Sequence, residues 1–138
     1  MSFSYTKYGI CLFCIQKSDA YNITQIIVHE IINRYTDSKF DLEQAYQLVP
    51  LSKEYIRKLF IKEHGISPAK FLQQKRLTLA KQLLAKKSDG FLRINEIAET
   101  CGFQDHAYFC RVFKHETGFT PNEFQLLLLD DNKIYPLG

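Results

Sequence analysis

The sequence has few of the residues on which several protein classes depend. Six Gly and four Pro among 138 residues are too few for the many tight turns of an all-β protein. No apolar run approaches the roughly 20 residues that cross a bilayer, and the early run over 10–15 lacks the basic start and cleavage site of an export signal. The cysteines Cys11, Cys14, Cys101 and Cys110 follow no secreted disulfide framework. These absences favour an α-rich protein of the cytoplasm without a membrane partner.

Tryptophan is also absent, but other residues supply material for a core. Eleven Phe and eight Tyr provide aromatic bulk, and apolar residues make up 46% of the chain. A charged fraction of 24% is typical of a folded protein rather than a disordered one. The length suits one compact domain or two very small domains that share a linker.

Positive charge is concentrated in the middle of the chain. From Ser52 to Lys87 there are ten Lys or Arg and two acids, which gives +8. From Ser88 onward there are four Lys or Arg and eight acids, which gives −4. A concentrated basic stretch is typical of a protein with a polyanionic partner, although a solvated helix surface produces the same pattern.

An internal repeat organises the sequence. Residues 55–71 and 108–124 share Tyr, Phe, Glu, Gly, Pro and Phe at an offset of 53. Upstream, 42–51 corresponds to 94–103 at an offset of 52, so the second copy has one extra residue near Gln104. A repeat of this kind predicts two copies of one structural unit.

Each copy predicts a helix, a tight turn and a second helix. In the second copy, apolar residues at i, i+3, i+4 and i+7 define one helix face: Ile94, Ile97, Ala98 and Cys101. Gly102 follows in the turn, and Asp105 is the predicted N-cap of the next helix. In the first copy Ser52 is the predicted N-cap of the second helix, and Gly65 ends that helix, as Gly118 does in the second copy. This arrangement is the helix-turn-helix motif.

Three further helices complete the prediction. Asn22–Gln25 and Thr120–Glu123 have the pattern of capping boxes that start a first and a closing helix. Ser67 and Pro68 open a long connecting helix that reaches about Lys86 and breaks over 87–90. We therefore predict an all-α fold of about seven helices. Its parts are an apolar tail (1–21), a first helix-turn-helix subdomain (22–67), a linker helix (68–87), a second subdomain (88–129) and a C-terminal tail (130–138).

The motifs over 76–84, 97–103, 108–114 and 118–121 resemble the DNA-binding domain of AraC-type transcription regulators. The resemblance covers roughly 23–125. It implies seven helices, of which the third and sixth, at about 52–64 and 105–117, lie in successive major grooves on one face of double-stranded DNA. It further implies a sequence-specific regulator without a cofactor that acts at the nucleoid.

Candidate base-reading residues lie on the face of each recognition helix opposite the predicted inward residues, which in the first helix are Tyr55, Ile56, Leu59 and Phe60. They are Lys53, Glu54, Arg57 and Lys58 in the first helix and His106, Ala107 and Arg111 in the second, with Cys110 on the same face. Arg57 and Arg111 can each present a bidentate fork to guanine, and Glu54 can accept from cytosine.

Other residues are candidates for contacts with the DNA backbone. Lysines outside the base-reading positions suit phosphates, and two capping hydroxyls lie where exposed N–H groups can hold a phosphate: Lys62, Lys70, Lys75 and Lys114, with Ser52 and Thr120. Because the second half is acidic, we expect the first subdomain and the linker to dominate the salt-dependent affinity.

Three positions depart from the family pattern. Tyr46 replaces the small residue that lets the helices of the first motif approach closely, and Pro50 lies in the turn. Gln125 replaces a basic residue that is common after the Thr-Pro segment. These departures, with the acidic second half, leave open a helical interaction module that binds RNA polymerase or another regulator and has weak or lost DNA binding.

No constellation of catalytic groups is present, so we expect no enzyme activity, catalytic residue or metal site. A metal or redox role for Cys11 and Cys14 is an alternative, although their apolar neighbours favour burial. Residues 3–15 have three interpretations: a remnant strand, a dimer contact, or a cap on the first helix, which we favour. Monomer and weak dimer both stay open, as do a short complete regulator and a fragment of a longer one.

Overall fold

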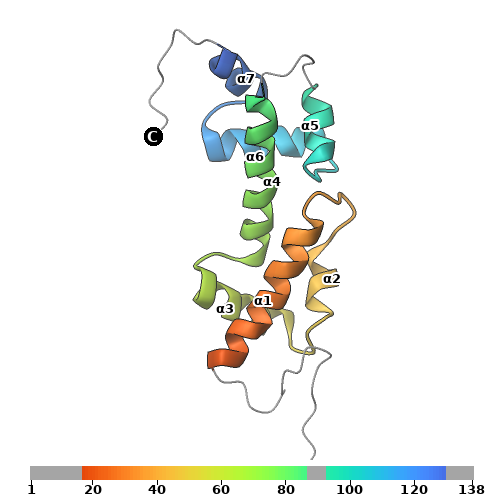
Figure 1. The fold of residues 1–138 in the computed structure, drawn as a ribbon, viewed down its shortest axis with the longest axis vertical. Helices are drawn as coiled ribbons and strands as arrows, with labels where there is room; N and C mark the ends of the chain where they lie inside the picture. The colour runs from red at the N-terminus through yellow and green to blue at the C-terminus, as the bar shows by residue number, and fades with distance from the viewer. Residues whose placement is uncertain (1–16, 87–92, 130–138) are drawn as a thin grey trace, which may run out of the picture. The chain divides into compact units, whose positions relative to one another are not determined.

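The computed structural model describes residues 17–86 and 93–129. In these residues all regular structure is helical, and seven α-helices follow one another along the chain (Figure 1). They are α1 (Lys17–Arg34), α2 (Leu42–Tyr46), α3 (Lys53–His64), α4 (Pro68–Ala85), α5 (Ile94–Thr100), α6 (His106–Thr117) and α7 (Pro121–Leu129). The predicted all-α fold of about seven helices is confirmed.

The chain divides into two compact units. Among the described residues, the first comprises 17–35 together with Lys39–Lys75, and the second comprises Thr36–Ser38 together with 76–86 and 93–129. Helix α4 occupies the predicted linker region and contributes its first half to one unit and its second half to the other. The predictions for Cys11 and Cys14, for 3–15 and for the break over 87–90 lie outside the described residues.

In the first unit, α1 packs against α2 and α3 (Figure 1). Ile23, Ile27 and Ile31, spaced one helical turn apart, are fully buried on the inner face of α1. Phe60 of α3 is also fully buried, and its ring meets that of Phe71 edge-on at a centroid distance of 5.7 Å. This core holds the face of α3 that carries Phe60 against the rest of the unit.

The predicted start of the first helix at Asn22 is wrong, because α1 begins at Lys17. Ala20 is buried with 7% exposure and continues the apolar face of Ile23 and Ile27 toward the N-terminus. The side chain of Thr24, which the capping prediction placed in the first turn, is buried, and its hydroxyl donates to the Tyr21 carbonyl oxygen at 2.9 Å. Burial of an additional apolar turn outweighs a local capping signal.

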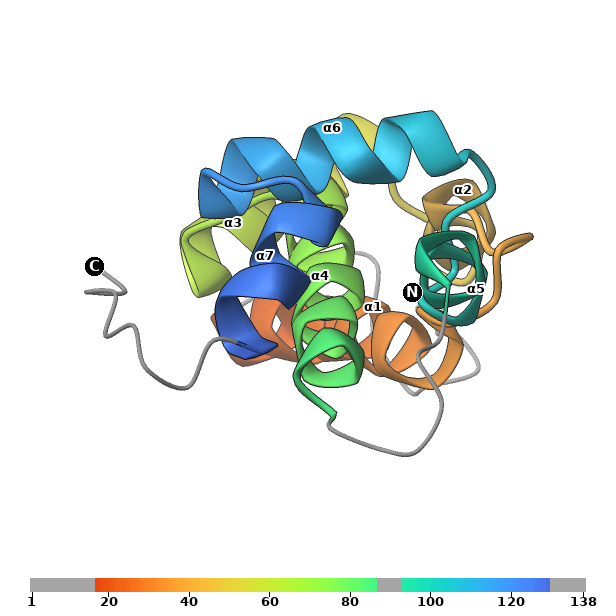
Figure 2. The same ribbon diagram turned by 90° about the horizontal axis from the view of Figure 1, so that it is seen from above.

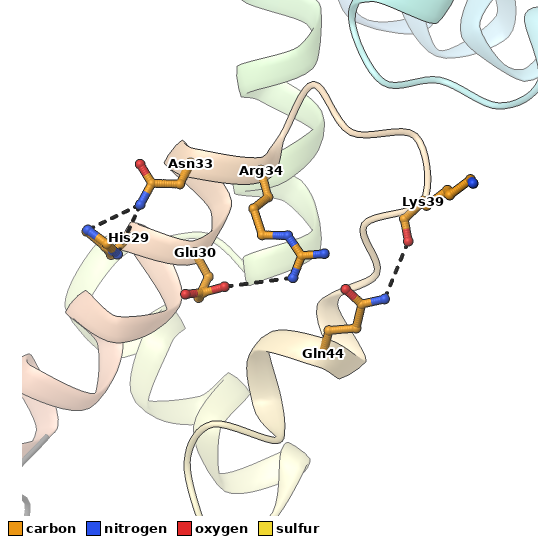
Figure 3. A network of polar contacts seen from close by, with 6 residues as sticks. All are labelled: His29, Glu30, Asn33, Arg34, Lys39 and Gln44. Atoms are coloured by element: carbon orange, nitrogen blue, oxygen red, sulfur yellow. Dashed lines mark hydrogen bonds and ion pairs between the residues drawn. The ribbon is translucent and has the colours of Figure 1, made fainter. Parts of the chain in front are cut away.

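Polar contacts lie at the end of α1 and, separately, between α2 and the segment that leads into it (Figure 3). The Arg34 guanidinium forms an ion pair with Glu30 at 3.9 Å and lies 4.8 Å from the centre of the Phe40 ring. The Gln44 side-chain amide of α2 donates to the Lys39 carbonyl oxygen at 3.5 Å. The contact between Arg34 and Phe40 joins the end of α1 to the segment before α2.

The second unit repeats this plan with α5, α6 and α7, and Figure 2 shows α7 beside α6. Phe109 and Phe113 of α6 are fully buried. The ring of Phe109 lies 4.9 Å from that of Phe103, and the ring of Phe113 meets Phe124 of α7 edge-on at 5.3 Å. Residues Ile97, Ala98 and Cys101, predicted as the inner face of the first helix of this motif, are buried in the same core.

The glycines predicted to end helices do so. Gly65 and Gly118 follow α3 and α6 with φ of 79° and 83°, and Gly102 takes a φ of 90° in the turn before α6. A side chain at such φ values is strained by contact between its Cβ and the following carbonyl oxygen. Glycine therefore sets the direction in which the chain leaves both recognition helices.

The extra residue of the second copy, Gln104, has a structural partner. Its side-chain amide donates to the carbonyl oxygen of Ser38. Nearby, the Arg76 guanidinium donates to the Asp37 carbonyl oxygen at 3.2 Å and lies 5.9 Å from the centre of the Phe103 ring. Burial lowers the pKa of Arg76. Gln104 and Arg76 thereby hold the short segment 36–38 within the second unit.

Candidate nucleic-acid interface

Helix α3 is formed by local signals at both ends and by one buried face. The Ser52 hydroxyl accepts a hydrogen bond from the Tyr55 backbone N–H at 3.2 Å, which confirms Ser52 as the N-cap. Gly65 closes the helix, and Ile56 and Phe60 are buried. The side of α3 opposite Ile56 and Phe60 is left for solvent or for a partner.

That exposed side carries the residues predicted to read bases in the first motif. Lys53, Glu54, Arg57 and Lys58 are all exposed, and they occupy positions i, i+1, i+4 and i+5, which share one helix face. Lys62 follows one turn later and is exposed as well. With four cations and one carboxylate, the face has the charge expected of a surface that contacts DNA.

Helix α2 contacts the start of this face through the Glu43 side chain. The Glu43 carboxylate forms an ion pair with the Lys53 ammonium. Tyr46 is buried with 7% exposure, so the larger residue is accommodated in the core of the first motif. Burial raises the pKa of the Tyr46 hydroxyl, and the positive charges of Arg57 and Lys53 act in the opposite direction.

Helix α6 is formed in the same way as α3. The Asp105 carboxylate accepts from the backbone N–H groups of Ala107 at 2.9 Å and Tyr108 at 3.4 Å, so Asp105 is the N-cap. The predicted residues His106, Ala107 and Arg111 are exposed on the face away from the core, and Lys114 extends that face. The second unit thus presents its own exposed helix face, which carries the residues predicted from the sequence.

The two N-caps define which positions of the recognition helices are equivalent. Because Ser52 and Asp105 are 53 residues apart, Arg111 corresponds to Lys58, and Cys110 corresponds to Arg57. Cys110 is half-buried, its Sγ lies 3.7 Å from Nε2 of His106, and burial raises the pKa of its thiol. The second helix therefore presents a thiol where the first presents a guanidinium.

The residues predicted to contact the DNA backbone are distributed over several elements. Lys75 of α4 is exposed, with its ammonium 5.4 Å from the centre of the Phe71 ring. Lys70 is partly buried, and its ammonium donates to Gln73 at 3.5 Å. The Thr120 hydroxyl accepts from the Glu123 N–H at 3.2 Å, which confirms the capping box that starts α7. The oxygen of Thr120 is therefore engaged in capping.

Sequence reasoning missed three exposed apolar or aromatic residues of the recognition helices. Tyr55, predicted to point inward, is 38% exposed, and its counterpart Tyr108 is 46% exposed. Ile61 is 45% exposed and lies one turn after Arg57, on the face of the predicted base readers. The exposure of Ile61 could have been predicted from its i+4 spacing to Arg57. The exposure of Tyr55 could not, because Tyr55 belongs to an apolar stripe that predicts burial.

Two features are absent from the described part of the chain. Over 17–86 and 93–129, no group of three or more His, Cys, Asp or Glu side chains is arranged to hold a metal ion. Within the same ranges, no helix combines the length and the apolar character that a membrane span needs.

Known proteins share this arrangement. Residues 47–126, more than half of the chain, match the family model of a helix-turn-helix domain. The HTH-type transcriptional activator RhaR from Cronobacter sakazakii is 39% identical over 85 residues, which are 62% of this chain and 29% of RhaR. The arabinose operon regulatory protein from Escherichia coli is 36% identical over 95 residues, which are 69% of this chain and 32% of that protein. The chain belongs to the AraC-type helix-turn-helix family.

A solved structure has the same fold. The C-terminal domain of the two-component response regulator yesN from Fusobacterium nucleatum has a TM-score of 0.67 and 36% sequence identity. The match covers 75% of this chain and 98% of that domain. The family and the fold are those of DNA-binding transcription regulators rather than of enzymes. The chain spans about a third of the length of the two curated relatives described above.

Proposed function

We propose that this AraC-type domain regulates transcription by inserting α3 and α6 into adjacent major grooves of a specific double-stranded DNA site. The observation that carries the proposal is the repeated construction of the two helices. Each has a side-chain N-cap, a glycine C-cap and two fully buried residues that direct a polar face outward. The relatives are named as a transcriptional activator and an operon regulator, which supports the same activity here.

Chemistry assigns the exposed side chains to bases. The forks of Arg57 and Arg111 fit guanine N7 and O6, Lys58 fits the same acceptors singly, and Glu54 accepts from the cytosine amino group. The methyl group of Ala107 suits the methyl group of thymine, and the ring nitrogens of His106 suit a base edge. Lys53 belongs to the proposed base-reading set as well, and it differs from the other members in its ion pair with Glu43.

Phosphate contacts fix the register of the domain without reading sequence. Exposed ammonium groups at Lys62, Lys75 and Lys114 suit this role, and so does the partly buried Lys70. The hydroxyls of Ser52 and Thr120 accept backbone hydrogen bonds as caps, and their own hydrogens stay available to a phosphate oxygen.

Selection of bound duplexes from a random DNA library tests the proposal, with wild type, Arg57→Ala and Arg111→Ala in parallel. The wild-type protein is expected to select one defined motif. Each substitution is expected to remove the preference at one position of that motif, at a cost of about 1–3 kcal/mol for the preferred base. Sequencing of the selected pools measures both effects.

Lys81→Ala is a matched control, because it removes one exposed positive charge of α4 outside the proposed base-reading set. It is expected to weaken binding to all duplexes equally and to leave the selected motif unchanged. If wild type selects no motif, or if both arginine variants select the wild-type motif, the proposal is wrong. Binding only to RNA polymerase or to another regulator would then favour the interaction module, which the family assignment does not favour.

A promoter-bound regulator acts on RNA polymerase, which we take as its second partner, at the nucleoid within the cytoplasm. Sedimentation at several protein concentrations distinguishes a monomer from a weak dimer, because only the dimer gains mass as the concentration rises.

A further inference from the structure

One predicted base reader of the first unit is engaged by another helix of the same motif. Lys53 is the first residue of α3, and Glu43 lies in the first turn of α2. Their side chains form an ion pair that bridges the two helices, and each is about half exposed to solvent. The hydrogen bond that Lys53 donates to the Glu43 carboxylate, followed by the negative charge of that carboxylate, raises the pKa of the Lys53 ammonium.

The second unit lacks this arrangement. At the offsets of the repeat, the counterpart of Glu43 is Asn95 and the counterpart of Lys53 is His106. Asn95 has no carboxylate, and the ring of His106 instead lies near the Sγ atom of Cys110. The second motif keeps the same fold without this ion pair, so the pair is not needed for the fold of the motif.

We propose that Glu43 is a specificity-determining residue that withholds Lys53 from DNA phosphates until the domain is seated in its own site. This inference rests on the proposed DNA-binding function. An ion pair that is exposed to water is weak, so a DNA oxygen held in the right place displaces Glu43 readily. On nonspecific DNA no oxygen is held there, and Glu43 competes with each passing phosphate. Glu43 thus lowers nonspecific affinity more than specific affinity.

Competition from Glu43 predicts that its removal raises the affinity for nonspecific DNA measurably. Glu43→Gln is expected to bind a duplex of unrelated sequence up to about fivefold more tightly than wild type. Its affinity for the selected site is expected to change less, so that the ratio of specific to nonspecific affinity falls. Both side chains are exposed, so the thermal stability of the variant should match that of wild type.

A double-mutant cycle on nonspecific duplex DNA identifies Lys53 as the residue through which Glu43 acts. The slope of log affinity against log salt changes by about 0.9 for each phosphate contact. Lys53→Gln is expected to reduce the slope by much less than this in wild type and by the full 0.9 or so in the Glu43→Gln background. Equal reductions in the two backgrounds would overturn the inference.

Glu43→Asp separates the ion pair from the net charge. It keeps the negative charge and shortens the side chain by one methylene, so the carboxylate no longer reaches Lys53 as it does in wild type. If Glu43 acts by holding Lys53, Glu43→Asp gains nonspecific affinity as Glu43→Gln does. If only charge matters, Glu43→Asp behaves like wild type, and the inference is overturned. Failure of wild type to bind any duplex would instead refute the proposed function itself.

Discussion

In the first unit the exposed face of α3 carries Lys53, Arg57 and Lys58, whereas the corresponding positions of α6 carry His106, Cys110 and Arg111. The buried faces of the two helices differ far less. Each contains two fully buried residues, and the second of these is a phenylalanine in both, Phe60 and Phe113. The comparison shows that the repeat preserves what holds each helix in place and varies what each helix presents.

This difference has a physical reason. A buried phenylalanine contacts many atoms, so a change of shape there leaves a cavity or a clash. An exposed residue has solvent as its neighbour, so its side chain can change with little effect on folding. Two units of one architecture can therefore present different side chains on their exposed faces.

The largest expected effect is the loss of stability of one unit when its buried phenylalanine, shared by both units, is removed. Phe60→Ala and Phe113→Ala are each expected to lower the free energy of unfolding of their own unit by about 3–5 kcal/mol, because each removes a fully buried ring. Residue-resolved hydrogen exchange measures the loss in each unit separately. Ile32→Ala is a control, since Ile32 is 48% exposed. Equal losses of protection in both units from either substitution would show that the two units unfold as one.

Alkaline pH should affect the second unit through a core position at which the units differ. Burial raises the pKa of Cys101 to about 12 from its ordinary value of 9.0, and the repeat counterpart of Cys101 is Val49. A pKa that is higher in the folded state stabilises the fold below the unfolded value and loses that contribution as pH rises. Wild type should therefore lose stability between pH 9 and about 12.

Thermal unfolding across this range, for wild type and for Cys101→Val, measures the effect. The valine variant places the residue of the first unit in the second and removes the titrating thiol, so its melting temperature should fall less between neutral and alkaline pH. The same fall in both proteins would show that the Cys101 thiol does not contribute to the alkaline loss.

The smallest expected effect concerns the charge of the two faces. Lys58 lies in a segment of ten bases and two acids, whereas Lys114 lies in one of four bases and eight acids. Because its surroundings are more basic, Lys58→Ala should reduce the slope of log affinity against log salt more than Lys114→Ala does. Titrations of one duplex at several salt concentrations measure both slopes. A larger reduction for Lys114→Ala would contradict the idea that the first unit and the linker dominate salt-dependent binding.

The sequence by itself determined the architecture and the exposure of the residues of the candidate interface. Ser52, Asp105, Gly65 and Gly118 act on backbone groups within a few residues of themselves, so the ends of α3 and α6 can be predicted from local sequence. Helical periodicity then separates buried from exposed positions, which is why the structure exposes every predicted base reader.

Tertiary structure decided what depends on residues far apart in the sequence. The ion pair between Glu43 and Lys53 joins two helices, and the contact of Gln104 with Ser38 spans 66 positions. The start of α1 depends on where Ala20 is buried. These contacts depend on which atoms surround a side chain in the folded protein. A periodic sequence pattern predicts only on which face of its helix a side chain lies.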